Sequence, residues 1–333
     1  MKRLKKTIAF LLVLCCVSIC FAGCKKKDDG VIRLNEVTHS IFYAPLYLAI
    51  NLGFMEEEGL TIELTNGGGS DTSMAALLSN SADVALLGPE TIVYVKSQGS
   101  TNHPIIFGQL TKRDGSFLVS RNTSEEFSWD NLTNTTIIGG RRGGLPAMTL
   151  EWIVNQHGYT NGTNINLNLE LAFNMTVPAF EGGTGDYCTM FEPTASEYEK
   201  AGKGKIVASL GEASGEIPYT CFMATSDYMK KNPEKLEAFL RAIQKAYNYI
   251  YENDPSVVAQ GLVASFEGVS LESIEASIIS YKNIDAWMST PVMQESAFNR
   301  LLEVMKNAGE IDEDCNVKFS SVVDNTFASK IAA

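Results

Sequence analysis

The sequence predicts an α/β fold with more than one lobe, and three observations support this prediction. From Val31 onward, apolar runs of strand length alternate with segments whose apolar residues recur at helical spacing. Glycine, proline and small polar residues separate these segments. The chain has 333 residues, which is too long for one small core and sufficient for two lobes of ordinary domain size.

The N-terminal segment is expected to direct processing rather than to fold. Basic residues open it, and the uncharged run 7–23 that follows is shorter than the roughly 20 residues of a membrane-spanning helix, as is typical of a secretory signal. The run ends in Phe21-Ala22-Gly23-Cys24 before a charged stretch, and this ending resembles the lipobox of bacterial lipoproteins. The resemblance implies a signal peptide over 1–23, a lipid on Cys24 and a tether over 24–30. A plain signal peptide and an uncleaved anchor are the alternatives.

Strands and helices alternate through the first half of the remaining chain. Strands are expected at 31–37, 61–65, 83–87, 105–110 and 116–120, with helices at 45–53, 73–78 and 90–98. Pro45 opens the first helix and Gly53 ends it, in keeping with the preferences of the two residues at helix termini. A glycine-rich turn, 66–72, leads into the second helix.

The second half repeats the alternation and then becomes helical. Strands are expected at 135–138, 167–171, 186–191, 205–210 and 219–225, and helices at 146–158, 233–252, 255–266, 271–280 and 291–307. Most of these helices start with proline, which is favoured there because the first N–H groups of a helix have no partner within it. This order predicts that strands from both halves are complete before the helical C-terminus begins.

Composition excludes several classes of protein. Hydrophobic residues make up 45% of the chain and charged residues 20%, so it is neither a disordered chain nor a polytopic membrane protein. Asp and Glu number 39 against 27 Lys and Arg, a formal net charge of −12. That balance argues against a nucleic-acid partner, which favours a basic face.

The residues that usually carry metal or covalent chemistry are scattered. The three histidines lack the spacing of zinc ligands: His39, His103 and His157. Outside the signal only Cys188, Cys221 and Cys315 remain, too few for a disulfide framework. A Cys188–Cys221 bridge is the alternative to the buried free thiols that we expect. The glycine-rich segments lack the P-loop and dinucleotide patterns, and 211–215 lacks the spacing of a nucleophile elbow. We therefore expect no metal, no cofactor and no catalytic residue.

Binding signals are clearer. Three strand-to-helix junctions, 66–72, 88–91 and 139–144, combine glycine with small polar residues. Ligands of open α/β sheets bind at the carboxyl ends of the strands, where glycine allows close approach and helix N-termini present free N–H groups. The candidate ligand-binding residues are Phe42, Tyr43, Gly68, Ser70, Asp71, Thr72, Glu90, Arg141, Gly143 and Glu192.

Each candidate also has a purely structural interpretation. Arg141 or Arg142 could clamp an anionic group, or the two could be a solvated pair. Glu192 follows a strand and would either reach a cleft or cap the next helix. Phe42 and Tyr43 either stack on a flat ligand or pack in the core. The residues 70–72 either meet the ligand or serve only as helix N-caps.

A known family shares several of these features. The run from His39 to Gly88, with Leu52-Gly53-Phe54-Met55-Glu56-Glu57-Glu58-Gly59-Leu60 followed by Ala82-Asp83-Val84-Ala85, resembles the first lobe of substrate-binding lipoproteins of ABC importers. The branch is the one for nitrate, sulfonates such as taurine, and thiamine pyrimidine precursors. Segments 139–158 and 185–195 resemble its second lobe, so the resemblance covers about residues 31–250.

The resemblance implies a two-lobed, type II periplasmic-binding-protein-like fold, in which each lobe is a mixed sheet flanked by helices and the C-terminus is helical. Lobe 1 would comprise 31–118 and 217–333, and lobe 2 would comprise 119–216, with chain crossings near 117–120 and 218–224. The protein would be a lipid-anchored monomer on the extracytoplasmic face of the bacterial membrane. It would capture a small organic solute and deliver it to a permease and its ATPase.

Two other functions stay open at this point. A yeast-type pyrimidine-precursor synthase resembles these binding proteins, but it carries a cysteine-rich segment and a pyridoxal-phosphate lysine; here the cysteine-dense stretch is 15–24, inside the signal. A solute-sensing lipoprotein without an importer is the second alternative. The ligand is also open, because Arg141, Arg142 and the glycine loops favour an anion. Glu90, Glu192 and the aromatic pair favour a heterocycle with N–H donors.

Overall fold

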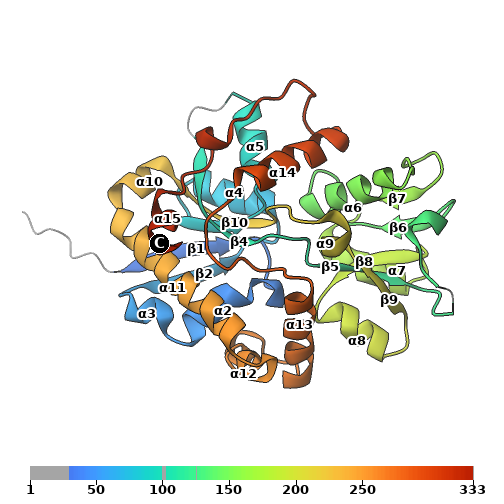
Figure 1. The fold of residues 1–333 in the computed structure, drawn as a ribbon, viewed down its shortest axis with the longest axis horizontal. Coiled ribbons are helices and arrows are strands. Elements are labelled where there is room, and N and C mark those ends of the chain that lie inside the picture. Colours follow the sequence, from blue (N-terminus) through green and yellow to red (C-terminus); the bar gives the residue numbers. More distant parts are fainter. Residues whose placement is uncertain (1–29, 100–102, 125, 333) are drawn as a thin grey trace, which may run out of the picture. The chain divides into compact units, whose positions relative to one another are not determined.

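A computed structural model describes residues 30–99, 103–124 and 126–332 (Figure 1). The predicted signal peptide and Cys24 lie outside the described residues. The described residues from Ile32 onward form one compact unit.

The first sheet is mixed and has five strands in the order β2-β1-β3-β10-β4. These are β1 (Val31–Glu36), β2 (Thr61–Asn66), β3 (Val84–Leu87), β4 (Pro104–Thr111) and β10 (Thr220–Thr225). β1 and β3 are parallel, with Leu34 opposite Val84, whereas β10 is antiparallel to both of its neighbours. The strand that arrives last in the sequence therefore occupies the interior of this sheet.

The second sheet also has five strands, in the order β7-β6-β8-β5-β9. They are β5 (Ser116–Ser120), β6 (Thr136–Ile138), β7 (Asn166–Asn168), β8 (Tyr187–Phe191) and β9 (Lys205–Ser209). β6 is parallel to β7 and β8, and β5 is antiparallel to β8 and β9. Two mixed five-stranded sheets confirm the predicted α/β class and each predicted strand, within a few residues at its ends.

The chain passes between the two sheets twice. β5 pairs along its whole length with β8 of the second sheet, so the first passage occupies residues 112–115, just before the region 117–120 expected from the sequence. The second passage lies at 215–219, directly before β10. The division into two lobes that move against each other stays a prediction.

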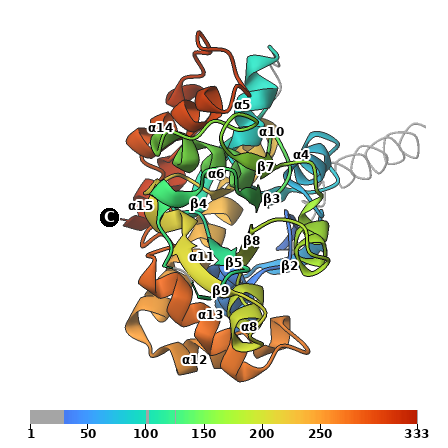
Figure 2. The same cartoon turned by 90° about the vertical axis from the view of Figure 1, so that its right-hand side faces the viewer.

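Helices flank both sheets, and the last third of the chain is mostly helical (Figures 1 and 2). Those near the first sheet are α2 (Ala44–Asn51), α3 (Phe54–Glu57), α4 (Ser70–Leu78), α5 (Glu90–Ser97), α10 (Ser226–Lys231), α11 (Pro233–Glu252), α12 (Pro255–Gln260), α13 (Leu271–Asn283), α14 (Glu295–Asn307) and α15 (Thr326–Ala332). Those of the second are α6 (Leu145–Gln156), α7 (Thr176–Glu181), α8 (Thr194–Lys200) and α9 (Leu210–Ser214). Within the described ranges, no helix combines the length and the apolar character needed to cross a membrane.

Two helix predictions require correction. The helix expected over 255–266 ends at Gln260, and a separate 3₁₀ turn occupies Val263–Ser265. The break lies at Gly261, which packs closely against α2: a Cβ atom on Gly261 would lie 2.7 Å from the Leu48 side chain. The helix expected from residue 291 begins only at Glu295.

The described cysteines are free thiols, as expected. Cys188 and Cys221 are fully buried, but Cys188 lies in β8 of the second sheet and Cys221 in β10 of the first. The alternative bridge between them is therefore wrong.

A buried polar network ties β1 to the C-terminal helices. The Glu36 carboxylate, 1% exposed, accepts hydrogen bonds from the Tyr47 hydroxyl and from His39 Nδ1, the latter at 2.9 Å. His39 Nε2 lies 2.7 Å from the Ser265 carbonyl oxygen. With Glu36 ionised, both partners of the ring are acceptors, and the doubly protonated, cationic form of His39 satisfies both contacts. The hydrogen bond that His39 donates to Glu36 is the main cause that raises the pKa of His39 above 6.5.

Replacing His39 by alanine is expected to lower the free energy of unfolding by about 1 kcal/mol at pH 5.5. This is less than the loss of a fully buried charged hydrogen bond would cost, because the ring of His39 is partly exposed. Because the pKa of His39 is raised in the folded state, the stabilisation by the His39–Glu36 contact is complete below pH 6.5. It is lost as the pH rises through the folded-state pKa of His39. Urea unfolding at pH 5.5 and pH 8.5 measures this. His157→Ala, which removes an exposed partner of Asp130, is the control; an equal loss in both variants would contradict the prediction.

Candidate functional site

The carboxyl ends of β1, β2 and β3 converge at one edge of the first sheet. Gly67 follows β2, and a Cβ atom there would lie 2.4 Å from Ser73 Oγ and 2.6 Å from Asn35 Oδ1. Glycine at this position therefore lets two polar side chains meet at the end of the strand. The next residue, Gly68, has a φ of +72°, a left-handed conformation that favours glycine, and it turns the chain into α4.

The three predicted residues of this junction lie in the first turn of α4. The N-cap position is Gly69, which has no side chain, so Ser70, Asp71 and Thr72 are not the caps that the alternative interpretation proposed. Ser70 Oγ lies 3.4 Å from the Gly88 amide that follows β3 and accepts its hydrogen bond. The other two side chains are exposed. This contact joins the α4 junction to the β3 junction.

Glu90 begins α5 just beyond the end of β3. It is 3% exposed, and its Oε2 atom has no hydrogen-bond partner among the described residues. Burial raises the pKa of Glu90 from 4.5 to about 7, while its own amide and that of Leu145 lower it by stabilising the carboxylate. A Cβ atom on Gly88 would lie 2.0 Å from Oε2, so glycine makes room for this carboxylate.

The N-terminus of α6 faces these strand ends from the second sheet. Arg141 Nη2 lies 3.2 Å from Asp71 Oδ1, and both side chains are more than half exposed. The Tyr94 hydroxyl donates a 3.0 Å hydrogen bond to the Gly143 carbonyl oxygen. Arg142 instead pairs with Glu170, at 3.7 Å. The predicted residues Asp71, Arg141, Gly143 and Glu90 are thus brought together from both sheets.

The aromatic pair is buried beside the first passage between the sheets. Phe42 is 1% exposed and Tyr43 4% exposed, and a Cβ atom on Gly115 would lie 2.5 Å from the Phe42 ring. The ring centroid of Phe42 lies 5.2–5.7 Å from those of its aromatic neighbours, which are Tyr43, Phe191, Tyr219 and Tyr281. In this conformation both side chains pack in the core, as one of the two interpretations expected.

The Glu192 side chain binds the first turn of α8, in keeping with the second of its two interpretations, a contact with the start of the next helix. Its carboxylate accepts hydrogen bonds from the amide and hydroxyl of Ser196, at 3.0 and 2.7 Å, in α8. The Glu192 amide donates to the Tyr281 hydroxyl at 3.1 Å. A ligand contact for this side chain is left as a prediction.

Other polar side chains near the strand ends escaped the sequence interpretation. Asn35 and Ser73 are 8% and 0% exposed, and Asn35 Oδ1 and Ser73 Oγ lack partners within the described ranges. Asp114, in the first passage, is also buried, and burial raises its pKa to about 6. An asparagine inside an apolar strand (ValIleArgLeuAsnGlu) was the available signal for the first of these.

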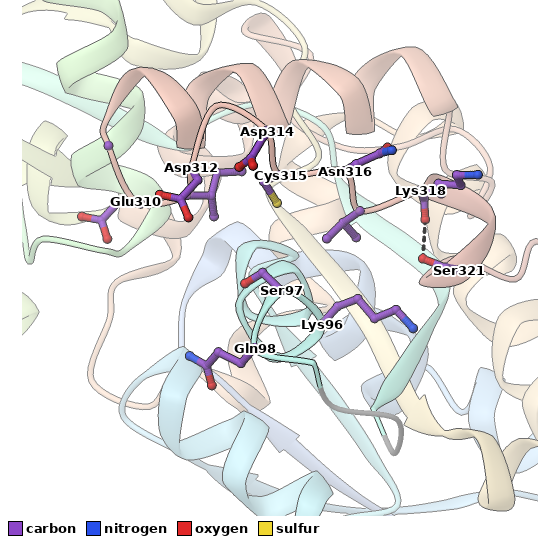
Figure 3. A pocket seen from close by; sticks show the side chains of 13 residues that line it. Lys96, Ser97, Gln98, Glu310, Asp312, Asp314, Cys315, Asn316, Lys318 and Ser321 are labelled. Atoms are coloured by element: carbon purple, nitrogen blue, oxygen red, sulfur yellow. Dashed lines mark hydrogen bonds between the residues drawn. The ribbon is translucent and has the colours of Figure 1, made fainter.

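A hollow of about 700 Å³ lies beside the C-terminal end of α5 (Figure 3). The end of α5 and the residue that follows it, Lys96 to Gln98, line one side of it, and residues within 309–321 line the other. Asp312, Asp314 and Cys315 surround it, but none of the residues predicted to bind ligand does.

Comparison with known proteins gives consistent matches. The chain matches the sequence model of the family described as NMT1/THI5 like over residues 41–256. It is 39% identical over 313 residues to "Putative binding protein YtlA" of Bacillus subtilis (strain 168), which covers 94% of this chain and 93% of that protein.

Two solved structures illustrate the likeness of fold. The alkanesulfonate-binding protein SsuA from Xanthomonas axonopodis pv. citri, bound to MOPS, matches with a TM-score of 0.71 at 14% identity, over 89% of this chain and 98% of that one. The periplasmic nitrate-binding protein NrtA from Synechocystis PCC 6803 matches with a TM-score of 0.72 at 16% identity, over 92% and 89% of the two chains. These matches confirm the predicted periplasmic-binding-protein-like fold.

Proposed function

Because the chain belongs to the NMT1/THI5-like family, we propose that it is an extracytoplasmic solute-binding protein of an ABC importer. It captures a small organic solute between two lobes and delivers it to a permease and its ATPase. The relative of 39% identity is named as a binding protein, which supports this assignment.

The observation that carries the proposal is the group of buried polar atoms without partners at the strand ends. Asn35 Oδ1, Ser73 Oγ and Glu90 Oε2 lack hydrogen bonds in the described structure. Leaving a buried polar atom unsatisfied costs about 1–3 kcal/mol, and a bound solute would remove this cost. In the proposed site, Phe42 and Tyr43 would supply one wall, and Arg141, Gly143 and Glu192 would supply the other.

Closure of the two lobes, 31–118 with 217–333 against 119–216, would enclose the solute. The contacts Asp71–Arg141 and Tyr94–Gly143 join elements of the two lobes, and opening of the lobes would break them while closure on a solute would form them again. A thermal-shift panel of amines, heterocycles, sulfonates and nitrate tests binding, since a ligand at 100 times its Kd adds about 2.7 kcal/mol of stability. Small-angle scattering should then show a smaller radius with the bound solute. A panel without any binder would overturn the proposal.

We further propose that Cys24 is the lipid-modified N-terminus and that the protein is a monomer anchored to the cell membrane. Labelling with a palmitate analogue in a bacterial host is expected to tag the wild type and to be lost in Cys24→Ser. Cys315→Ser is the control and should be labelled as strongly as the wild type. Equal labelling of both variants would contradict the lipid assignment.

A binding role is favoured over catalysis by the state of the buried thiols. Burial raises the pKa of Cys188 to about 12 and that of Cys221 well above its usual value, so neither thiol is an activated nucleophile at neutral pH. Within the described ranges, no group of three His, Cys, Asp or Glu side chains is arranged to hold a metal ion. A sensor without an importer is the other alternative, and loss of solute uptake in a permease deletion would argue against it.

A further inference from the structure

The junction after β3 fixes the chemical class of the solute, an inference that rests on the proposed function. We infer that Glu90 is a built-in anion at the N-terminus of α6, so that the site excludes anionic solutes and takes one that donates N–H hydrogen bonds: an amine, an amidine or an amino-substituted heterocycle. Three independent features of the site support this inference.

The first feature is the position of the carboxylate. The N-terminus of a helix attracts anions because its first amides are free and its dipole is positive. The helix α5, which Glu90 begins, lies against the start of α6, because the Tyr94 hydroxyl donates a 3.0 Å hydrogen bond to the Gly143 carbonyl oxygen. Burial raises the pKa of Glu90, and the Leu145 amide at the start of α6 opposes this by stabilising the charged form. A sulfonate or nitrate placed there would meet a buried carboxylate, and two like charges at close range repel strongly in a dry site.

The second feature is the orientation of the unsatisfied side chains. The Thr65 hydroxyl donates to the Leu34 carbonyl oxygen at 3.3 Å and therefore accepts the hydrogen bond from Asn35 Nδ2 at 3.0 Å. This pairing identifies the amide nitrogen of Asn35, so the oxygen is the atom that points to Gly67 and Ser73. Asn35 Oδ1 and Glu90 Oε2 are both acceptors without a donor in the described structure, and Ser73 Oγ, also without a partner, can donate or accept. Acceptors therefore predominate among these atoms, and N–H groups of a solute would satisfy them.

The third feature is that the nearby arginines are already engaged. Arg141 is paired with Asp71 and Arg142 with Glu170, and all four side chains are at least half exposed. Neither guanidinium therefore supplies a buried positive charge to offset Glu90. A second carboxylate, that of Glu310, would lie 3.5 Å from a Cβ atom on Gly143, so the surroundings of this helix end are rich in negative charge.

Probes of matched shape and opposite charge test the inference. Benzamidine and benzoate share a planar ring and a planar trigonal group, and guanidinium and nitrate are both planar trigonal ions. Calorimetric titration of the purified protein at pH 8 should show that each N–H donor binds at least tenfold more tightly than its anionic counterpart. In Glu90→Gln, which keeps the size of the side chain, the preference should shrink at least tenfold. Glu272→Gln removes an exposed carboxylate of α13 that pairs with Lys200, and as the matched control it should leave the preference unchanged.

The outcomes separate the inference from the proposed function. Tighter binding of nitrate or benzoate, or equal behaviour of the paired probes in the wild type, overturns the inference and leaves the solute-binding function standing. A preference that is identical in the wild type and Glu90→Gln also overturns it, because another group would then set the selectivity. The proposed function fails separately, when no solute of the broad thermal-shift panel binds.

Discussion

At pH 8 and without ligand, Glu90→Gln is expected to be more stable than the wild type by about 3 kcal/mol, because each pKa unit corresponds to about 1.4 kcal/mol. Burial raises the pKa of Glu90 from 4.5 to about 7, so the folded protein holds this proton more tightly than the unfolded chain does. The wild type should therefore lose stability as the pH rises from about 4.5 to about 7, and no further above that range.

Urea unfolding of both proteins at pH 5 and pH 8 measures the effect. The difference between them should be small at pH 5, where the folded wild type carries a neutral carboxyl group, and large at pH 8. Glu170→Gln removes an exposed carboxylate and should change stability little at either pH. A difference that is the same at both pH values would show that the Glu90 charge is not the cause. If Glu90→Gln is more stable than the wild type and also binds N–H donors more weakly, Glu90 serves binding and lowers the stability of the free protein.

Phe42→Ala is expected to lower the free energy of unfolding by about 3–5 kcal/mol, the usual range for removing a buried aromatic side chain. Phe42 is 1% exposed and touches aromatic rings from the second sheet, from the second passage between the sheets and from α13. Phe173→Ala is a matched control, because Phe173 also packs on Phe191, at 5.6 Å, but is 52% exposed. We expect it to cost less than about 1 kcal/mol.

Denaturant titration of the two variants measures both losses. Equal losses would contradict the view that Phe42 is a core residue at the passage between the sheets. If Phe42→Leu folds with near wild-type stability but binds solute less well, the ring also has the ligand role that the sequence suggested.

The strands were predictable because their apolar runs are short and bounded by glycine or polar residues. The short helices α7, α8 and α9 were not, since segments of five to seven residues carry too few turns for a helical period to show. The break after Gln260 depends on a contact between Gly261 and α2, and no local pattern encodes such a contact.

Some residues of the candidate site were likewise predictable from the sequence, and others were not. Glycine at a strand end is visible in the sequence, and it led to Ser70 and Glu90. Asn35 and Ser73 became candidates only when the fold placed both of them against Gly67. Whether a carboxylate faces a ligand or a helix end is decided by its neighbours in space, as the contact of Glu192 with Ser196 illustrates.

The interior position of β10 has a consequence for the order in which the chain can fold. Among the described strands, β4 lies at the edge of the first sheet and pairs with β10 alone, and β10 begins at Thr220, after the whole second sheet. The strands of the second sheet, by contrast, lie in the unbroken stretch 116–209 and can pair as soon as that stretch is available. Until β10 arrives, β3 and β4 present open edges of the kind that associate with other chains. A chain emerging N-terminus first therefore completes its second sheet before its first, and the late pairing over more than 100 residues of sequence is the slow step expected of a high-contact-order topology.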